Sequence, residues 1–311
     1  MIAGLVLSGC GTTPSSSAPT APPTTVPSGS ISASTATDQS VGMPKSSLNL
    51  KAVALGSKVY STSIRAVGSE FVCSPLAGSL PVRTPPWVNI TAYTWNMTTK
   101  KAVAGDVAWS STFRTSHSGP NLVLRGNDLP PRSGTFPVDP ADPAYAYNPD
   151  LVPVTAHDFS LSVPNSPAQN PVPTCVTGDG PVGVMSNGVI LSGPLDANGN
   201  DAAAVETQDT CHGSPGDTGY HYVSLSPCLL SPTALTTSTQ VGWALDGFGI
   251  YVEYGADGNL LTNQDLDVCH GRTSLVPWHG KMVNIYHYDL TLEYPYAVSC
   301  FAGTPSSLRG S

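Results

Sequence analysis

Apolar and polar residues alternate in several short stretches between turn residues, which is the pattern of β-strands. The stretches richest in β-branched and aromatic residues are 48–64, 87–97 and 120–129. Asn187-Gly188 stands between two apolar runs and predicts a tight hairpin turn. Segment 200–211 predicts a short helix, with Asn200 or Asp201 as its N-cap. Strands and turns therefore dominate the predicted structure.

The composition also favours short strands over long helices. The chain of 311 residues contains 30 glycines and 30 prolines, and its proline share is about twice the usual one. Because both residue types interrupt regular structure, the chain must turn often. We therefore expect a mostly β fold, a disulfide-stabilised sandwich or barrel-like domain with little helix.

Composition changes along the chain predict its organisation. Residues 1–10 are apolar, as in a signal remnant. Residues 11–47 are mainly Ser, Thr, Pro and Ala, cannot bury a core and are expected to form a disordered stalk. Residues 48–304 carry the strand pattern and predict a β domain, either continuous or with residues 48–125 as a distinct N-terminal layer. Residues 305–311 are expected to be a tail.

The first ten residues end in Leu7-Ser8-Gly9-Cys10 and resemble a bacterial lipobox. The resemblance implies that Cys10 carries a lipid and anchors the protein to the outer face of a bacterial membrane. Because no Lys or Arg precedes the apolar run, we expect the natural signal to start upstream. A cut secretory signal and a chance apolar start are the alternatives.

The cysteine count fits an exported protein. With Cys10 lipidated, six of the seven cysteines remain, an even number that predicts three disulfides among fifteen possible pairings. Two pairs of cysteines each flank one Tyr-His-Tyr segment, and the two remaining cysteines form the third pair. The predicted disulfides are Cys211–Cys228, Cys269–Cys300 and Cys73–Cys175. Metal ligation by cysteine is the alternative, but no Cys-x-x-Cys pair occurs.

The charge distribution does not indicate a nucleic-acid partner. The formal net charge is -8, and the 13 Lys and Arg residues are scattered singly along the chain. Apolar runs also stay below the ~18 residues that a membrane-spanning helix needs. A lipid on Cys10 is therefore the membrane contact that the sequence predicts.

The two Tyr-His-Tyr segments, 220–222 and 286–288, suggest metal chemistry. In an extended strand, the residue two places after a histidine returns to the face of the histidine. That residue is Val223 in the first copy and Asp289 in the second. The second copy therefore offers a His287–Asp289 pair that could hold zinc, iron or manganese.

Five of the seven histidines lie between His212 and His287. This clustering predicts a divalent-metal site built from His221, His287 and Asp289 with His212 or His270. The alternative is structural, with the histidines bonded to the backbone and the tyrosines packed in the core.

Asp246 lies between apolar stretches and is expected to be buried, so it needs a partner. Arg272 is the candidate, because arginine pairs with carboxylate in a two-pronged geometry. A catalytic acid or a metal ligand is the alternative role for Asp246.

The ordered blocks along the second half of the chain resemble the bacterial YHYH-domain proteins. They are SNGVIL, DTCHG, GYHYVSLSPC, GWALDGFGIY, LDVCHGR, YHYDLTLEYPY and CFAGTP, and the resemblance covers roughly residues 106–304. It implies an exported, disulfide-containing β domain and no particular activity. The fourth residue of the family name is replaced by Val223 and Asp289 here. A histidine-rich copper site is therefore disfavoured, whereas a mixed His/carboxylate site is not.

Together these features predict a lipid-anchored extracytoplasmic protein that binds a divalent metal ion. Two other functions stay open. One is a structural or adhesion module of the cell surface without a ligand. The other, which we favour less, is a metal-dependent hydrolase or oxidase, and no local catalytic motif supports an enzyme.

Overall fold

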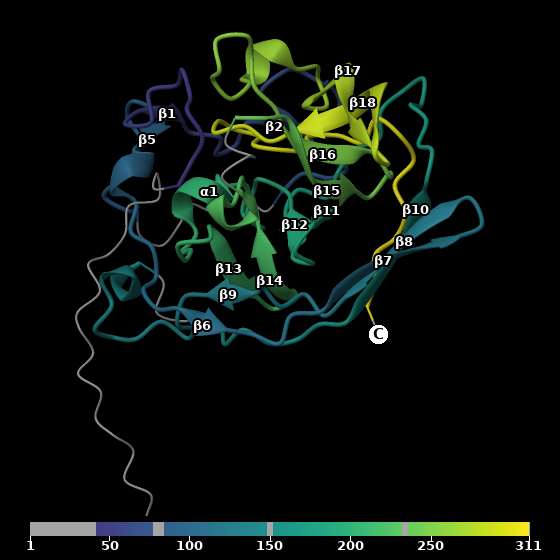
Figure 1. Cartoon of the computed structure of the whole chain (residues 1–311). Coiled ribbons are helices and arrows are strands. Elements are labelled where there is room, and N and C mark those ends of the chain that lie inside the picture. The colour runs from purple at the N-terminus through teal and green to yellow at the C-terminus, as the bar shows by residue number, and fades with distance from the viewer. Residues whose placement is uncertain (1–41, 77–83, 148–151, 232–235, 311) are drawn as a thin grey trace, which may run out of the picture. The chain divides into compact units, whose positions relative to one another are not determined.

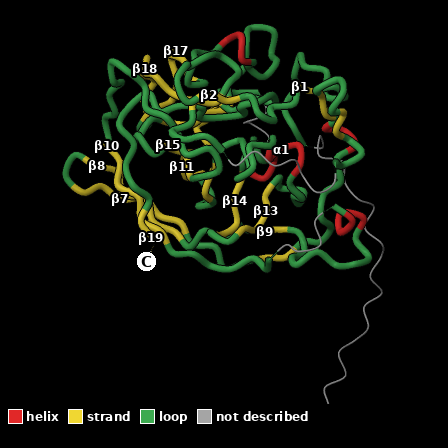
Figure 2. The backbone as a smooth tube through the Cα atoms, turned by 180° about the vertical axis from the view of Figure 1, so that it is seen from behind, coloured by secondary structure: helices red, strands yellow, loops and turns green. Residues whose placement is uncertain are grey.

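The computed structural model describes residues 42–76, 84–147, 152–231 and 236–310, and these are mostly β, as predicted. Figures 1 and 2 show short strands joined by long stretches of loop, with little helix. Cys10 and most of the expected stalk lie outside the described residues. No helix of the described residues is long and apolar enough to cross a membrane.

The largest sheet has eight strands in the order β13-β14-β12-β11-β15-β16-β18-β17. In that order the bounds are Gly213–Gly216, Gly219–Tyr222, Ile190–Ser192, Pro181–Met185, Thr239–Ala244, Gly249–Val252, Lys281–Asp289 and Gly271–Trp278. The edge strands are β13 and β17, so the sheet is open and does not close into a barrel.

This sheet consists of two halves with the same connectivity. In the first half, β14 lies beside hairpin β11–β12 in the sheet and pairs parallel with β12 and antiparallel with β13. In the second half, β18 lies beside hairpin β15–β16 and pairs parallel with β16 and antiparallel with β17. Strands β11 and β15 join the halves, and Figure 1 shows β13–β14 and β17–β18 at opposite ends. The sequence repeat is therefore a structural repeat.

The loops before β13 and β17 repeat in detail. His212 and His270 both adopt a left-handed backbone conformation, with φ angles of 61° and 68°. The hydroxyl of Tyr220 donates to Asp209 at 2.8 Å. The equivalent hydroxyl, of Tyr286, donates to Asp267 at 3.2 Å. The first tyrosine of each Tyr-His-Tyr thus binds the aspartate of its own Asp-x-Cys-His-Gly loop.

The remaining strands form smaller sheets. A four-stranded sheet has the order β19 (Arg309–Gly310), β10 (Phe159–Pro164), β8 (Asn121–Gly126) and β7 (Phe113–Ser118). A three-stranded sheet has the order β1 (Val53–Ala54), β5 (Thr94–Trp95) and β4 (Val88–Asn89). Two pairs complete the set: β2 (Tyr60–Ser61) with β3 (Glu70–Phe71), and β6 (Val107–Ala108) with β9 (Arg132–Ser133).

The predicted helix and hairpin are both present. Helix α1 spans Ala202–Val205, and Asp201 is its N-cap because its side chain accepts a hydrogen bond from the backbone N–H of Ala204. Asn187-Gly188 lies in the turn between β11 and β12, where Gly188 has a φ of 87°. The 3-10 helices are η1 (Met97–Thr99), η2 (Pro143–Ala146), η3 (Pro227–Leu229) and η4 (Asn263–Asp265).

The C-terminal end of the domain is part of a sheet. Leu308 packs against the core, and β19 pairs with β10, so the residues expected to be a tail form an edge strand. Strand β8, from the proposed N-terminal layer, also pairs with β10. The disulfides are Cys73–Cys175, Cys211–Cys228 and Cys269–Cys300, the pairs that the sequence predicts.

Candidate metal centre

Three ionisable side chains meet at the end of β16 and β18. Their ligand atoms, from Glu253, His287 and Asp289, all lie within 4.8 Å of one another. His287 and Asp289 stand two places apart on β18, whereas Glu253 directly follows β16, the neighbouring parallel strand. The side chains of His287 and Asp289 are fully buried, and that of Glu253 is 7% exposed. The predicted His-x-Asp pair therefore has a third partner.

The hydrogen bonds of His287 fix the direction of its two ring nitrogens. Its Nδ1 lies 2.9 Å from the carbonyl oxygen of Ile285, which can only accept, so Nδ1 carries a proton. Its Nε2 lies 2.7 Å from Oε2 of Glu253 and 3.5 Å from Oδ2 of Asp289. A ring nitrogen that faces two carboxyl groups must carry either a proton or a metal ion. Orientation of Nδ1–H by a backbone carbonyl is common in metal-binding histidines.

The buried carboxyl group of Asp289 lacks hydrogen-bond partners. Both carboxyl oxygens are buried, and neither has a hydrogen bond. Burial raises the pKa of Asp289 to about 8, although the charge of His287 acts in the opposite direction. Unmet acceptor capacity of this kind is costly in a protein interior. A divalent cation would satisfy it, so these residues fit a metal ion.

Glu253 is held in place from the other side. The hydroxyl of Ser274 donates to both carboxylate oxygens at 3.1 Å, and the guanidinium of Arg272 lies 3.7 Å away. Burial acts to raise the pKa of Glu253, but His287 and Arg272 together hold it below its usual value. Burial likewise acts to lower the pKa of His287, but the hydrogen bond to Glu253 and the charge of Asp289 raise it. Glu253 is therefore an ionised carboxylate.

One imidazole nitrogen and two carboxylates are a donor set for zinc, manganese or ferrous iron. Ligand atoms about 2.1 Å from a tetrahedral zinc ion are about 3.4 Å apart. The distance of 3.5 Å between His287 and Asp289 meets this requirement, and that of 2.7 Å between His287 and Glu253 must lengthen slightly. A small movement of the Glu253 side chain is enough.

The other predicted ligands lie elsewhere, which corrects the five-residue site. His212 and His270 have left-handed backbones, and neither belongs to the group formed by Glu253, His287 and Asp289. His212 bonds to the carbonyl oxygen of Leu225 at 2.9 Å, and His270 to the hydroxyl of Thr291 at 3.1 Å. Burial lowers the pKa of His270 to about 3. Both rings therefore bond to structural partners outside this group.

His221 is the counterpart of His287 in the first half. Its Nδ1 also faces the carbonyl oxygen two residues earlier, at 3.4 Å, and its Nε2 lies 3.6 Å from Glu206. The position equivalent to Asp289 is Val223. The bridges Leu195–Asp201 and Tyr254–Leu260 are equivalent in the two halves, so the position equivalent to Glu253 is Pro194. The first half therefore repeats the histidine without the two carboxylates.

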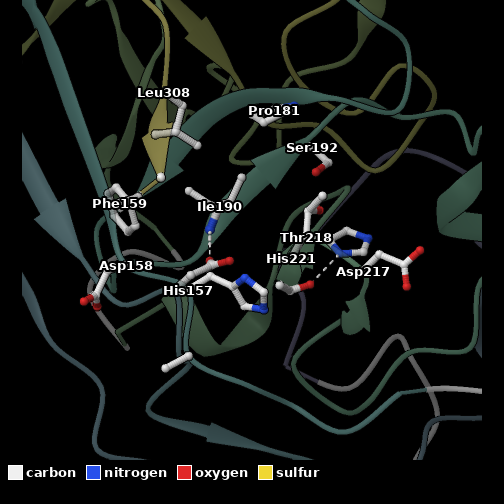
Figure 3. Close-up of a pocket in the computed structure, with 14 residues that line it drawn as sticks. His157, Asp158, Phe159, Pro181, Ile190, Ser192, Asp217, Thr218, His221 and Leu308 are labelled. Carbon is white, nitrogen blue, oxygen red and sulfur yellow. Dashed lines mark hydrogen bonds between the residues drawn. The ribbon is translucent and has the colours of Figure 1, made fainter.

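His221 lines a cavity of about 650 Å³ next to the first half. Figure 3 shows His157, Ile190 and Phe159 at the same cavity. Asp128 also lines it and accepts a hydrogen bond from the backbone N–H of Ile190 at 2.9 Å. Burial raises the pKa of Asp128 to about 8. This cavity lies between the first half of the large sheet and residues of β10 and β19, and Glu253, His287 and Asp289 do not line it.

The predicted Asp246–Arg272 ion pair is wrong. Asp246 is buried, as expected, but it accepts hydrogen bonds from the hydroxyl of Tyr288 at 2.6 Å and the backbone N–H of Gly303 at 2.8 Å. Arg272 lies opposite His287 on β17 and faces Glu253. Asp246 therefore orders the Tyr288 ring, and Arg272 supports the candidate metal centre.

Part of the chain matches a known protein family. Residues 160–261 match the family model described as YHYH protein. The chain carries a YHYH domain. The matched part of the YHYH domain includes the whole first half of the sheet, the hairpin β15–β16 and Glu253. His287 and Asp289 lie beyond it. No curated protein and no solved structure matches the chain.

The raised pKa of Asp289 predicts a pH dependence in metal-free protein. Folded Asp289 keeps its proton up to about pH 8, whereas an unfolded aspartate loses it near pH ~3.9. Its contribution to stability is therefore complete below pH ~4 and is lost as pH rises toward ~8. We expect the Asp289→Asn variant to gain Tm relative to the parent over this range, measured in EDTA. A Tm difference that stays constant with pH would contradict the assignment.

Proposed function

We propose that the protein binds one divalent metal ion through Glu253, His287 and Asp289. The observation that carries this proposal is the buried Asp289 carboxyl, which has no hydrogen bond and lies beside a histidine nitrogen that faces two acids. A metal ion would neutralise the two carboxylates and at the same time bind the lone pair of Nε2 of His287.

The burial of all three ligands favours metal retention over catalysis. An enzyme needs a coordination position that a substrate can reach, and here the most exposed ligand shows only 7% of its side chain. We therefore propose a role in holding metal, by capture or buffering. A lipid on Cys10 would place this role at the outer face of a bacterial membrane.

Elemental analysis of untagged protein tests the proposal most directly. The expected result is close to one equivalent of zinc, manganese or iron per chain. His287→Gln should remove the metal, whereas His221→Gln, the matched change in the first half, should retain it. Metal-free protein that gains no Tm with zinc, manganese, iron, copper or calcium would refute metal binding and leave the structural ion pair His287–Glu253.

Metal uptake is also expected to release protons, because Nε2 of His287 and the Asp289 carboxyl must both be deprotonated to bind. Zinc affinity should therefore fall as the pH falls from 8 to 6. Titration calorimetry in buffers with different ionisation enthalpies measures the number of protons released. Release of no proton at pH 7 would contradict the protonation states described above.

A further inference from the structure

The four-stranded sheet gathers three arginines that are far apart in the sequence. Arg114 on β7 lies directly opposite Arg125 on β8. Arg125 lies opposite Ser160 on β10, which in turn lies opposite Arg309 on β19. Residues that face each other across an antiparallel ladder point to the same side of the sheet. The Arg114–Arg125–Ser160–Arg309 row, called the arginine row below, therefore lies on one face.

This face is the solvent side of the sheet. Along β10 the residues alternate, with Phe159, Leu161 and Val163 buried and Ser160 and Ser162 on the other side. The three arginines are all exposed. Neighbouring strands are ~4.8 Å apart, so the Cα atoms of the three arginines lie within about 15 Å of one another. In a protein of net charge -8, this is a local concentration of positive charge.

Among the described residues, the arginine row forms no ion pair. Within the described residues, Arg132 pairs with Asp106 and Arg272 with Glu253, whereas no ion pair is formed by the three arginines of the row. Like charges directly opposite each other on a sheet are destabilising. Arg114 and Arg125 therefore reduce the stability of the fold, which an anionic ligand would reverse.

The row also lines a hollow of about 490 Å³. Thr112 and Asp158, each two residues along the chain from the arginine row, also line this hollow. The hollow is therefore lined by three arginines and one aspartate. Guanidinium groups bind phosphate oxygens through two parallel hydrogen bonds, and a serine hydroxyl adds a further donor. We propose that the arginine row is a binding site for a phosphate-bearing small molecule, separate from the candidate metal centre.

Titration calorimetry with inorganic pyrophosphate tests this site in the folded, disulfide-bonded protein. The expected result is binding that weakens as sodium chloride is added. Arg125→Gln should weaken it by about tenfold or more, because a charge-assisted hydrogen bond is lost. Arg132→Gln, at an exposed arginine that already has an acidic partner, should bind as the parent does. Asp289→Asn should also bind normally, which separates this site from metal binding.

A second readout guards against simple loss of folding. Without ligand at low salt, Arg125→Gln should have a higher Tm than the parent because it relieves the repulsion with Arg114. If Arg125→Gln does not fold, Arg114→Gln on the adjacent strand takes its place. Absence of pyrophosphate binding by the parent, or equal weakening in Arg132→Gln, would overturn the proposal.

Discussion

Replacing Asp289 by asparagine is expected to weaken zinc binding strongly and leave the metal-free protein at least as stable as the parent. The amide keeps the shape of the carboxyl group but cannot supply a negative ligand. Its loss should weaken zinc binding on the order of 100-fold or more, at least as much as loss of a residue that only orients a ligand. Metal-free Asp289 is largely protonated at pH 7, because its pKa is about 8, so the neutral amide removes no ion pair there.

Thermal unfolding with and without zinc measures this effect. Zinc at 100 times its Kd stabilises a protein by ~2.7 kcal/mol, which corresponds to roughly 5–10 °C in Tm for a domain of this size. The parent should show this rise and Asp289→Asn should not. Asp106→Asn, a change at an exposed carboxylate, is the control and should respond like the parent. A zinc-dependent rise in Asp289→Asn as large as the parent's would rule out this site.

Removing the Cys73–Cys175 disulfide is expected to destabilise the protein by about 4–5 kcal/mol. The bridge joins residues 102 positions apart, so it closes the longest loop of the three disulfides. Closing a loop of this length removes much of the conformational entropy of the unfolded chain. Its cysteines are only half-buried or exposed. Serine replacement at both positions therefore removes the cross-link without opening a large cavity in the core.

Guanidinium unfolding of the Cys73→Ser/Cys175→Ser double variant tests this expectation. The variant should keep its circular dichroism spectrum and unfold at a lower denaturant concentration than the parent. In a separate thermal unfolding experiment its Tm should fall by roughly 8–20 °C. The Cys269–Cys300 bridge is a less clean comparison, because both cysteines are buried and their replacement adds a cavity. A change in stability below ~1 kcal/mol would show that the loop-entropy account fails here.

Local patterns in the sequence predicted much of the β architecture. The Asn187-Gly188 hairpin and the Asp201 helix cap depend on residues within a few positions of each other, so their prediction needed no tertiary information. The disulfide pairs followed from the repeated position of cysteines around Tyr-His-Tyr. His287 and Asp289 were placed together for the same kind of reason, because strand side chains alternate.

Glu253 was missed because nothing near it in the sequence marks it as a ligand. It lies 34 residues before His287 and reaches that ring because β16 and β18 pair in parallel. His212 and His270 were wrongly included, because their rings bond to the carbonyl oxygen of Leu225 and the hydroxyl of Thr291. Sequence proximity of histidines did not predict where the rings point.

The sequence by itself determined the class of fold, the repeat, the cysteine partners and one ligand pair, since each follows from the short-range geometry of strands and turns. Tertiary structure alone decided that Glu253 completes the candidate metal centre and that Asp246 binds Tyr288 and not Arg272. It also aligned Arg114, Arg125 and Arg309, which are scattered along the chain. These outcomes depend on which distant strands pair and in what register, and long-range packing of the whole domain sets that register.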